Sequence, residues 1–386
     1  MLKRILYIHN GADLYGGGRF LLRLVSNLDR RFYQPFVIVP YDGPLSEALR
    51  IQKVEVAVMK SLPVISRRVF HSWRLFPFVL RIPFSAVVLA LFIRRNKIDI
   101  VHTNTGSIPS AGLGARITRR PHLWHIHDSF HEFRKLWWFY SRYILWSSDR
   151  LVCVSQVIAD QFSTKPGKLV VVYNGLPLDE SDLIPASLLR TFREQFNLND
   201  DRVVGVVGRI KFQRKGQDVF VKAISVLKQR VANVKYLIVG SPFPGNEDHL
   251  INLKKLIRQL GVDDVVILTG ELEDVKIVYR ILDILVLPSC FPEPFGTVVL
   301  EAMVNGVPVV GTRIGGTTEQ IEDGVSGILV EPNDPSVLAE QIELLLNNHV
   351  LYHSIRKAAL EWVRRLFSFE KMFNRLDGIY RELLNV

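Results

Sequence analysis

The chain has 386 residues, of which 48% are hydrophobic and 23% are charged. This composition excludes an intrinsically disordered protein, and the length exceeds what one ordinary hydrophobic core serves, so we expect two domains. A formal net charge of +11 favours anionic partners, namely nucleotides, nucleic acid or an acidic membrane surface. The first residues are basic and then apolar without a small-residue cleavage site, so they predict a first strand rather than a signal peptide.

Apolar runs typical of strands alternate with helical stretches along the whole chain. In the first half they cover 4–9, 36–39, 54–58, 98–102, 122–127 and 151–154. In the second half they cover 203–207, 234–239, 265–268, 284–288, 308–311 and 327–330. This alternation predicts an α/β protein with two Rossmann-like domains, 1–176 and 177–368, whose parallel sheets face each other across a ligand-binding cleft.

Three consecutive glycines, Gly16 to Gly18, follow the first predicted strand and precede a helical pattern at 20–28. Glycine lets the backbone approach a phosphate closely, and the helix start adds a partial positive charge, so Gly16 and Gly17 are candidate phosphate contacts. The spacing is not G-x-G-x-x-G and no acidic residue stands at a convincing ribose-binding distance, so a dinucleotide fingerprint is weak here. A plain turn at 14–19 remains the alternative.

The segment 63–97 is rich in arginine and aromatic residues. Its longest apolar run, 84–93, is about half of what a bilayer span requires, so we do not expect it to cross a membrane. One interpretation is peripheral contact with anionic lipid, made mainly by 63–82. The other is an amphipathic helix at about 83–96 that packs on the sheet, with its basic residues solvated.

Histidines cluster at the end of the predicted strand 122–127. His125 and His127 would share a face, which permits a metal site, but no cysteine or carboxylate pair completes a convincing ligand set. His127 ends the strand at the cleft edge and is better interpreted as a hydrogen-bonding group over a bound ligand.

Arg209 and Lys215 bracket the loop that follows the predicted strand 203–207. Single basic residues on loops are usually solvated. These two stand at the carboxyl end of a strand, however, so both can converge on a diphosphate.

Two carboxylates, Glu293 and Glu301, lie eight positions apart around Gly296. The strand 284–288 precedes them, and a helix at 297–304 opens after the glycine, so its first N–H groups can stabilise an anion. Glu301 shares a helix face with Thr297, and each ionised carboxylate can accept two hydroxyl hydrogen bonds. Phosphate combined with several hydroxyls describes a nucleotide sugar.

No Asp-x-Asp occurs in the chain. Many enzymes that bind nucleotide sugars hold a divalent ion with such a pair, because the departing diphosphate must be neutralised. Here we expect Arg209, Lys215 and the helix N-termini to neutralise it, with no metal and no other cofactor.

With these residues assembled, the sequence resembles the retaining glycosyltransferases of family four, also called group one glycosyl transferases, which have the GT-B fold. The motifs that carry the resemblance are Gly208-Arg209, Lys215-Gly216, Pro288-Ser289, Glu293-Pro-Phe-Gly296, Leu300-Glu-Ala-Met303, Gly306-Val-Pro-Val309, Gly315-Gly316 and Glu322-Asp-Gly324. The glycine segment departs from the family's commoner Gly-Gly-x-Glu form, because Arg19 follows Gly18. The final helix, 369–386, resembles the family's segment that crosses back to the first domain.

The resemblance implies a role for each matching position. Glu293 would hold donor-sugar hydroxyls beside the backbone of Phe295 and Gly296, and Glu301 would bind the ribose. The amides of Thr297 and Val298 would hold the diphosphate. Arg209 and Lys215 would neutralise it, while His127 would touch the donor sugar from the other domain.

The resulting prediction is a retaining, metal-independent hexosyltransferase. It would use a nucleoside diphosphate sugar donor and a lipid-linked or saccharide acceptor, bind no nucleic acid, and act in cell-envelope polysaccharide synthesis. We expect it in the cytoplasm, peripheral on the inner face of the membrane. The alternatives are a GT-B nucleotide-sugar epimerase or hydrolase, a non-catalytic sugar-nucleotide-binding partner of another transferase, and, by fold analogy alone, an NAD-dependent oxidoreductase.

Overall fold

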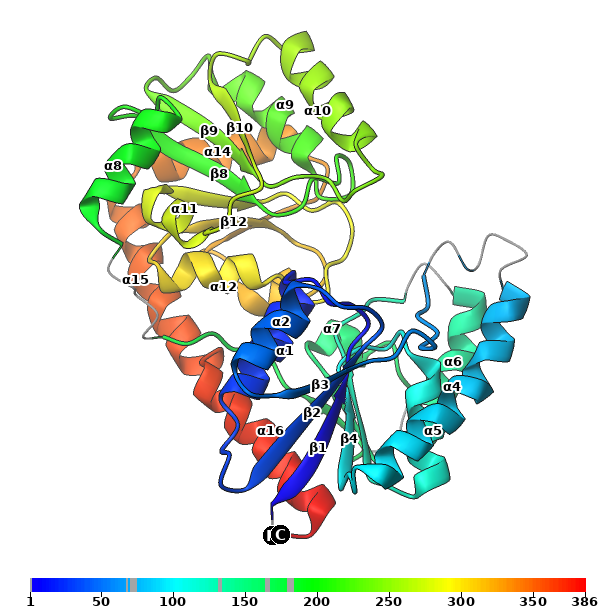
Figure 1. Cartoon of the computed structure of the whole chain (residues 1–386). Coiled ribbons are helices and arrows are strands. Elements are labelled where there is room, and N and C mark those ends of the chain that lie inside the picture. Colours follow the sequence, from blue (N-terminus) through cyan, green and yellow to red (C-terminus); the bar gives the residue numbers. More distant parts are fainter. Residues whose placement is uncertain (1, 67–68, 70–74, 131–133, 164–166, 179–183) are drawn as a thin grey trace. The chain divides into compact units, whose positions relative to one another are not determined.

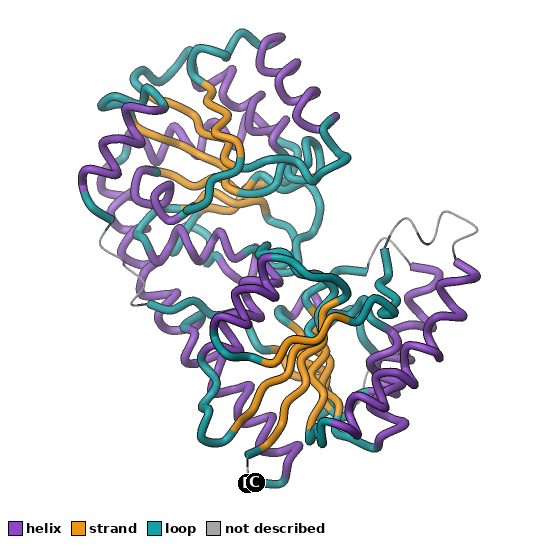
Figure 2. Tube along the Cα trace, viewed as in Figure 1, coloured by secondary structure: helices purple, strands orange, loops and turns teal. Residues whose placement is uncertain are grey.

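The structure is a computed structural model of the chain that describes residues 2–66, 69, 75–130, 134–163, 167–178 and 184–386 (Figure 1). The chain forms two compact units. The first contains Met1–Tyr173 and Met372–Val386, and the second contains Asn174–Lys371. In each unit the strands run side by side and the helices lie outside them (Figure 2). The sequence placed the corresponding boundaries after residues 176 and 368.

The first unit contains a parallel sheet in the order β3-β2-β1-β4-β5-β6-β7. Its strands are β1 (Lys3–Ile8), β2 (Tyr33–Val39), β3 (Glu55–Val58), β4 (Ile100–Thr103), β5 (His122–Ile126), β6 (Arg150–Cys153) and β7 (Leu169–Val171). The central strand β1 pairs with both neighbours, since Ile5 lies opposite Pro35 on β2 and Ile100 on β4. The edge strand β7 was not predicted, although its three half-buried residues belong to the apolar run 169–173.

Helices cover both faces of this sheet, with α1, α2 and α16 on one side and α4, α5 and α6 on the other (Figure 1). The helices of this unit are α1 (Gly16–Ser26), α2 (Pro44–Ile51), α4 (Leu75–Arg95), α5 (Pro109–Thr118), α6 (Arg134–Ser147), α7 (Gln156–Ala159) and α16 (Phe369–Leu384). Proline opens α2 and α5, where its missing N–H costs no helical hydrogen bond. The Tyr380 hydroxyl of α16 lies 3.2 Å from that of Tyr7 on β1, which fixes the C-terminal helix on the sheet.

The helix α4 differs from the predicted helix at 83–96. It begins at Leu75 and continues through Pro83. The additional two turns belong to the stretch that was expected to precede the helix and to face lipid. Residues 67–68 and 70–74 of that stretch lie outside the described residues.

The second unit contains a parallel sheet in the order β10-β9-β8-β11-β12-β13. Its strands are β8 (Arg202–Val207), β9 (Val234–Val239), β10 (Val266–Gly270), β11 (Ile284–Leu287), β12 (Val309–Thr312) and β13 (Ile328–Val330). Its helices are α8 (Ala186–Gln195), α9 (Gln217–Leu227), α10 (Asp248–Gln259), α11 (Lys276–Ile281), α12 (Thr297–Val304), α13 (Thr317–Gln320), α14 (Pro335–Asn347) and α15 (His349–Leu366). Alternate strand residues such as Val204, Tyr236 and Val286 join one core with Phe220 of α9 and Ile342 of α14.

Because the strands of each sheet are parallel, their carboxyl ends lie at one edge, where open α/β sheets bind ligands. In the second unit this edge carries the β8–α9 and β11–α12 loops. In the first unit it carries the loops after β1, β4 and β5. The sequence-predicted site residues lie on or next to these loops.

Candidate functional site

Two glycines pack against the backbone of the loop between β11 and α12. The Gly316 N–H donates to the Glu293 carbonyl at 2.8 Å. Gly315 has φ +61°, and a Cβ there would lie 2.6 Å from the same carbonyl. Only glycine therefore allows this approach, which fixes the backbone that carries Glu293.

The Glu293 carboxylate binds two side chains. Its Oε2 accepts from the Lys215 ammonium at 2.6 Å, and its Oε1 accepts from the Ser289 hydroxyl. The side chains of Lys215 and Glu293 are 29% and 14% exposed, so the pair is largely shielded from water but still reachable. Burial by itself raises the pKa of Glu293, but Lys215 and Ser289 outweigh it and lower the pKa below the ordinary value. Glu293 is therefore an ionised acceptor.

The β8–α9 loop packs directly against the β11–α12 loop. Gly216 caps α9 with φ +68°, and a Cβ at this position would lie 1.7 Å from the Pro288 carbonyl oxygen. The Cys290 N–H also donates to the Arg214 carbonyl at 3.2 Å. This packing brings Lys215 to Glu293, although the two residues are 78 positions apart.

Arg209 lies at the start of the same β8–α9 loop, after Gly208 with φ +140°. Its guanidinium lies over the Phe243 ring, 4.9 Å from the centroid. Its carbonyl accepts from the Gln217 side-chain amide at 3.1 Å. The loop thus presents a second, half-buried cation at this edge.

The helix α12 begins after Gly296, which makes no side-chain cap. The first N–H groups of a helix, here including those of Thr297 and Val298, have no intrahelical acceptor and favour an anion. Gln320 donates to the Gly296 carbonyl at 2.9 Å and fixes the turn. The Phe295 side chain is buried against Phe367, so only its backbone can face a ligand.

Glu301 lies on the second turn of α12 and is half-buried. Its Oε2 accepts from the Tyr279 hydroxyl of α11 at 2.6 Å, which holds the carboxylate in place. Neither Tyr279 nor Ser289 was predicted from the sequence as a partner of the two glutamates. Ser289 belongs to the Pro288-Ser289 motif, whereas Tyr279 carries no sequence signal.

In the first unit the glycine segment is helical. The helix α1 begins at Gly16, so the predicted loop at 14–19 is wrong and the three glycines form the first helical turn. A Cβ on Gly18 would lie 2.0 Å from the Asp13 carbonyl oxygen, and one on Gly17 would lie 3.2 Å from the His9 ring. Close packing against the β1–α1 connection therefore explains why glycine is needed here.

His127 follows β5 and contacts three groups on one face of the first sheet. Its Nε2 lies 3.0 Å from the Asn104 side-chain oxygen, which can only accept, so Nε2 carries the proton. Phe20 and His125 pack against its ring at 4.6 and 4.2 Å between centroids. Burial, together with His125 and His9, lowers the pKa of His127 well below its ordinary value, so the ring is neutral.

Two neighbours of His127 were missed by the sequence analysis. His9 directly follows β1, and its Nδ1 lies 3.3 Å from the Asn104 carbonyl oxygen. Asn104 directly follows β4 and is buried. Both stand at the carboxyl ends of predicted strands, which is the signal that could have identified them.

The histidine cluster does not form a recognisable metal site. His125 and His127 do share a face, as the sequence predicted. Among the residues that the structure describes, however, no group of three or more histidine, cysteine, aspartate or glutamate side chains is placed to hold an ion.

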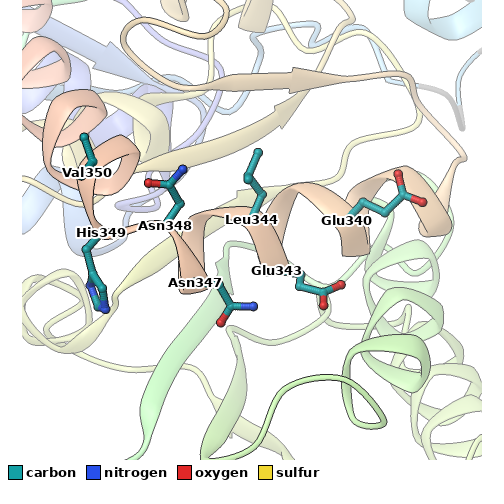
Figure 3. A pocket seen from close by; sticks show the side chains of 7 residues that line it. All are labelled: Glu340, Glu343, Leu344, Asn347, Asn348, His349 and Val350. Atoms are coloured by element: carbon teal, nitrogen blue, oxygen red, sulfur yellow. The ribbon is translucent and has the colours of Figure 1, made fainter.

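Two cavities lie away from these residues. One, of about 660 Å³, lies where α14 meets α15 (Figure 3). Its lining side chains are Glu340, Glu343, Leu344, Asn347, Asn348, His349 and Val350. They include two carboxylates and no lysine or arginine, so this cavity is unsuited to a diphosphate.

The other cavity, of about 380 Å³, lies in the first unit beside α6. It is lined by Phe130, Trp137, Trp138, Ser141, Arg142, Leu145, Gln161 and Ser163. Phe130 and Trp137 stack at 4.5 Å between centroids, and the Arg142 guanidinium lies 3.6 Å from the Trp138 centroid. Aromatic faces beside a cation suit a ligand with apolar and anionic parts.

Comparison with known proteins assigns the class. Residues 15–180 match the family described as Glycosyltransferase Family 4, and residues 190–362 match the family described as Glycosyl transferases group 1. Together these two matches cover most of the chain, which therefore belongs to the glycosyltransferases that carry both domains, and this confirms the resemblance seen in the sequence.

Individual relatives agree with this class. The chain is 28% identical over 305 residues to an uncharacterized glycosyltransferase of Methanocaldococcus jannaschii, covering 74% of this chain and 76% of that protein. It is 30% identical over 248 residues to a D-inositol 3-phosphate glycosyltransferase of Acidothermus cellulolyticus, covering 62% of this chain. That alignment spans only about half, 54%, of the relative's own length.

The fold also has solved counterparts. The structure of Anabaena HepE in complex with UDP matches with a TM-score of 0.83 at 22% identity, over 98% of this chain and 100% of that chain. The two parallel α/β units are thus those of the GT-B fold, and the predicted fold class is confirmed.

Proposed function

We propose that this glycosyltransferase transfers a hexose, with retention of anomeric configuration, from a nucleoside diphosphate sugar to a lipid-linked or saccharide acceptor. The observation that carries the proposal is the Lys215–Glu293 ion pair at the carboxyl edge of the second sheet. It joins, at 2.6 Å, a carboxylate that can accept hydrogen bonds from sugar hydroxyls and an ammonium that can bind a diphosphate. A donor substrate needs both groups at the junction between its sugar and its diphosphate.

The remaining donor contacts follow from the geometry of the second unit. Arg209 joins Lys215 in neutralising the diphosphate, and the N–H groups of Thr297 and Val298 donate to its oxygens. Glu301, held by Tyr279, accepts from the ribose hydroxyls. The backbone of Phe295 and Gly296 lies beside the sugar.

The first unit supplies the other contacts under this proposal. Neutral His127 offers a hydrogen-bonding ring to the donor sugar, and the backbone at Gly16 and Gly17 approaches the phosphates. The cavity lined by Trp137, Trp138 and Arg142 is the candidate for the acceptor.

The chemistry is mainly electrostatic. The bond from the anomeric carbon to the diphosphate oxygen breaks, and its electron pair leaves with the diphosphate. The acceptor oxygen bonds to the same face of the anomeric carbon and gives its proton to the departing oxygen. Arg209, Lys215 and the helix N-terminus stabilise the charge that grows on the diphosphate, so no carboxylate acts as a covalent nucleophile.

We further propose that transfer needs no metal ion, since Arg209, Lys215 and the N-terminus of α12 would neutralise the diphosphate under this proposal. The test is transfer after dialysis against a chelator, with and without added Mg²⁺ or Mn²⁺. We expect the rate to change less than about twofold, whereas loss with chelator and recovery with the ion would contradict the proposal.

The donor is tested by a thermal-shift screen of uridine, guanosine and adenosine diphosphate sugars, because a ligand of the native state raises its midpoint. Uridine diphosphate sugars come first, since Anabaena HepE was solved with UDP and with UDP and glucose. Detectable NAD binding without nucleotide-sugar binding would instead support the oxidoreductase alternative.

Transfer itself is tested with Glu293→Ala and Lys215→Ala, both of which we expect to abolish product formation while the protein stays folded. The matched control is Lys222→Ala, which removes another ion-paired lysine, the partner of Asp218 on α9. Wild-type turnover in either site variant would refute the assignment. Product analysis without acceptor separates epimerase or hydrolase activity from transfer, and no turnover with any acceptor would support a non-catalytic binding partner.

With such an acceptor, we propose that the enzyme acts in cell-envelope polysaccharide synthesis, in the cytoplasm and peripheral on the inner face of the membrane. An exposed apolar helix, α4, supports this location. Fractionation of cells that express the protein tests it, and recovery of all the protein in the soluble fraction would contradict it.

A further inference from the structure

The outer face of α4 exposes a row of large apolar side chains. The exposed fractions are 73% for Phe76, 57% for Leu80, 63% for Phe84, 52% for Val87 and 61% for Leu91. Their spacing of three and four residues puts them on one side of the helix. An apolar row of this length is unusual on a water-facing helix and marks an interaction surface.

The inner face of α4 is part of the domain. Ala86, Leu89, Ala90 and Ile93 are buried, and a Cβ on Gly114 of α5 would lie 3.0 Å from the Leu89 Cβ. The Ser85 hydroxyl also donates to that of Ser110 at 3.1 Å. One side of the C-terminal half of the helix is thus bound to the protein, whereas no residue from Leu75 to Phe84 is buried. The opposite side of the helix remains for another partner.

Positive charge accompanies the apolar row. Arg81 is exposed near the middle of α4, and Arg94, Arg95 and Lys97 are exposed at its C-terminal end. The sequence of α4 contains no aspartate or glutamate. The surface therefore combines apolar and cationic groups, and its charge is complementary to an anionic partner.

We propose that the outer face of α4 docks this enzyme on an anionic lipid bilayer, with the helix lying in the interface plane rather than crossing the membrane. Its length of 21 residues and a mean hydropathy of 2.2 would permit a span. The attachment of its inner face to α5 favours the in-plane orientation. A second copy of α4 is a poorer partner, because it would oppose arginines with arginines and offer no carboxylate on the helix.

This inference deepens the proposed function, and it rests on that function only through the acceptor, because a lipid-linked acceptor is found at a bilayer. Phe76, Phe84 and Leu91 would insert between headgroups, while Arg94 and Arg95 would contact lipid phosphates. Docking would thereby hold the first unit at the surface that carries the acceptor.

The test is cosedimentation of the full chain with vesicles of phosphatidylcholine alone and with added phosphatidylglycerol. We expect Phe84→Gln with Leu91→Gln to lower the partition coefficient about tenfold or more, because two apolar side chains no longer insert into the bilayer. The matched control is Ile51→Gln with Val350→Gln, which alters side chains that are 82% and 83% exposed elsewhere and should leave binding unchanged.

Charge is tested separately by Arg94→Gln with Arg95→Gln. For each arginine removed, we expect the partition coefficient to fall roughly fivefold on the anionic vesicles and to stay the same on the neutral ones. The control Lys254→Gln with Lys255→Gln removes two exposed charges from α10 and should bind as the wild type does.

Three results would overturn the docking proposal. The first is wild-type protein that stays in the supernatant, and the second is α4 variants that bind vesicles as the wild type does. The third is a dimer that depends on α4 and does not bind vesicles. Thermal shift with nucleotide sugars, measured without vesicles on the same variants, keeps the two proposals apart. If the protein binds vesicles but no nucleotide sugar, the proposed transfer reaction fails and docking stands. If it binds a nucleotide sugar but no vesicles, docking and the proposed peripheral location fail and the transfer reaction stands.

Discussion

Gly216→Ala is the sharpest test of how the two site loops support each other. The added Cβ would lie 1.7 Å from the Pro288 carbonyl oxygen, about half of a normal contact distance, so one loop must move by more than about 1 Å. The positive φ adds a cost of about 1–2 kcal/mol for any residue with a Cβ. With an overpacking cost of similar size, we expect a total loss of about 3 kcal/mol.

The matched control is Gly261→Ala, which has nearly the same φ, +61°, but no atom within 4 Å of the added Cβ. This substitution should lower the free energy of unfolding by only about 1 kcal/mol. Differential scanning calorimetry should then show the midpoint of the second unit falling by roughly 6–12 °C for Gly216→Ala and roughly 2–4 °C for the control. Equal decreases would refute the argument that the loops are in contact here.

Three further predictions concern other contacts. Lys215→Met leaves the Glu293 carboxylate without its ammonium partner and should lower the free energy of unfolding by about 2 kcal/mol, and adding Glu293→Gln should restore most of this loss. Urea unfolding of the wild type, the two single variants and the double variant measures the coupling. Tyr279→Phe removes the hydroxyl that holds Glu301, so initial-rate kinetics should show KM for the donor about three- to tenfold higher with kcat unchanged. Burial lowers the pKa of His125 well below its ordinary value, so the unfolded chain binds the proton more readily. The stability of the first unit should therefore be complete above about pH 6.5 and decrease below it, and His125→Phe should reduce that slope in chemical denaturation.

Most strands could be predicted because parallel strands buried on both faces are continuous apolar runs. The run at 284–288, for example, corresponds to β11 at Ile284–Leu287. The strand β7 was missed although its three residues belong to the apolar run 169–173. The run at 54–58 predicted the edge strand β3 although none of its residues is buried, so the apolar run itself, and not burial, is the sequence signal.

The start of α1 shows a different limit. Glycine has low helix propensity, so a triple glycine predicts a loop. In the structure the same glycines are helical, and a side chain at Gly18 would overlap the Asp13 carbonyl, so the packing of this helix requires glycine there. A tertiary contact thus overrides the local preference, and one sequence without its packing does not reveal it.

The position of the candidate site could be predicted more readily than its internal contacts. Arg209, Lys215 and Glu293 were placed at strand ends by their order in the chain, and parallel topology brings such ends to one edge. The hydrogen bonds from Tyr279 to Glu301 and from His127 to Asn104 depend on how separate elements pack. No fixed spacing in the sequence relates the two residues of either pair, so these hydrogen bonds could be found only in the structure.

The Lys215–Glu293 pair has a consequence for selectivity under the proposed function. Without a donor, each group is the other's partner at 2.6 Å. A nucleotide sugar offers a diphosphate to the ammonium and hydroxyls to the carboxylate, so it replaces both halves of the pair. A nucleoside diphosphate offers only the anion and would leave Glu293 with Ser289 alone, in a largely buried position where an unpaired carboxylate is costly. The pair should therefore favour binding of the intact donor over the diphosphate product, which assists product release.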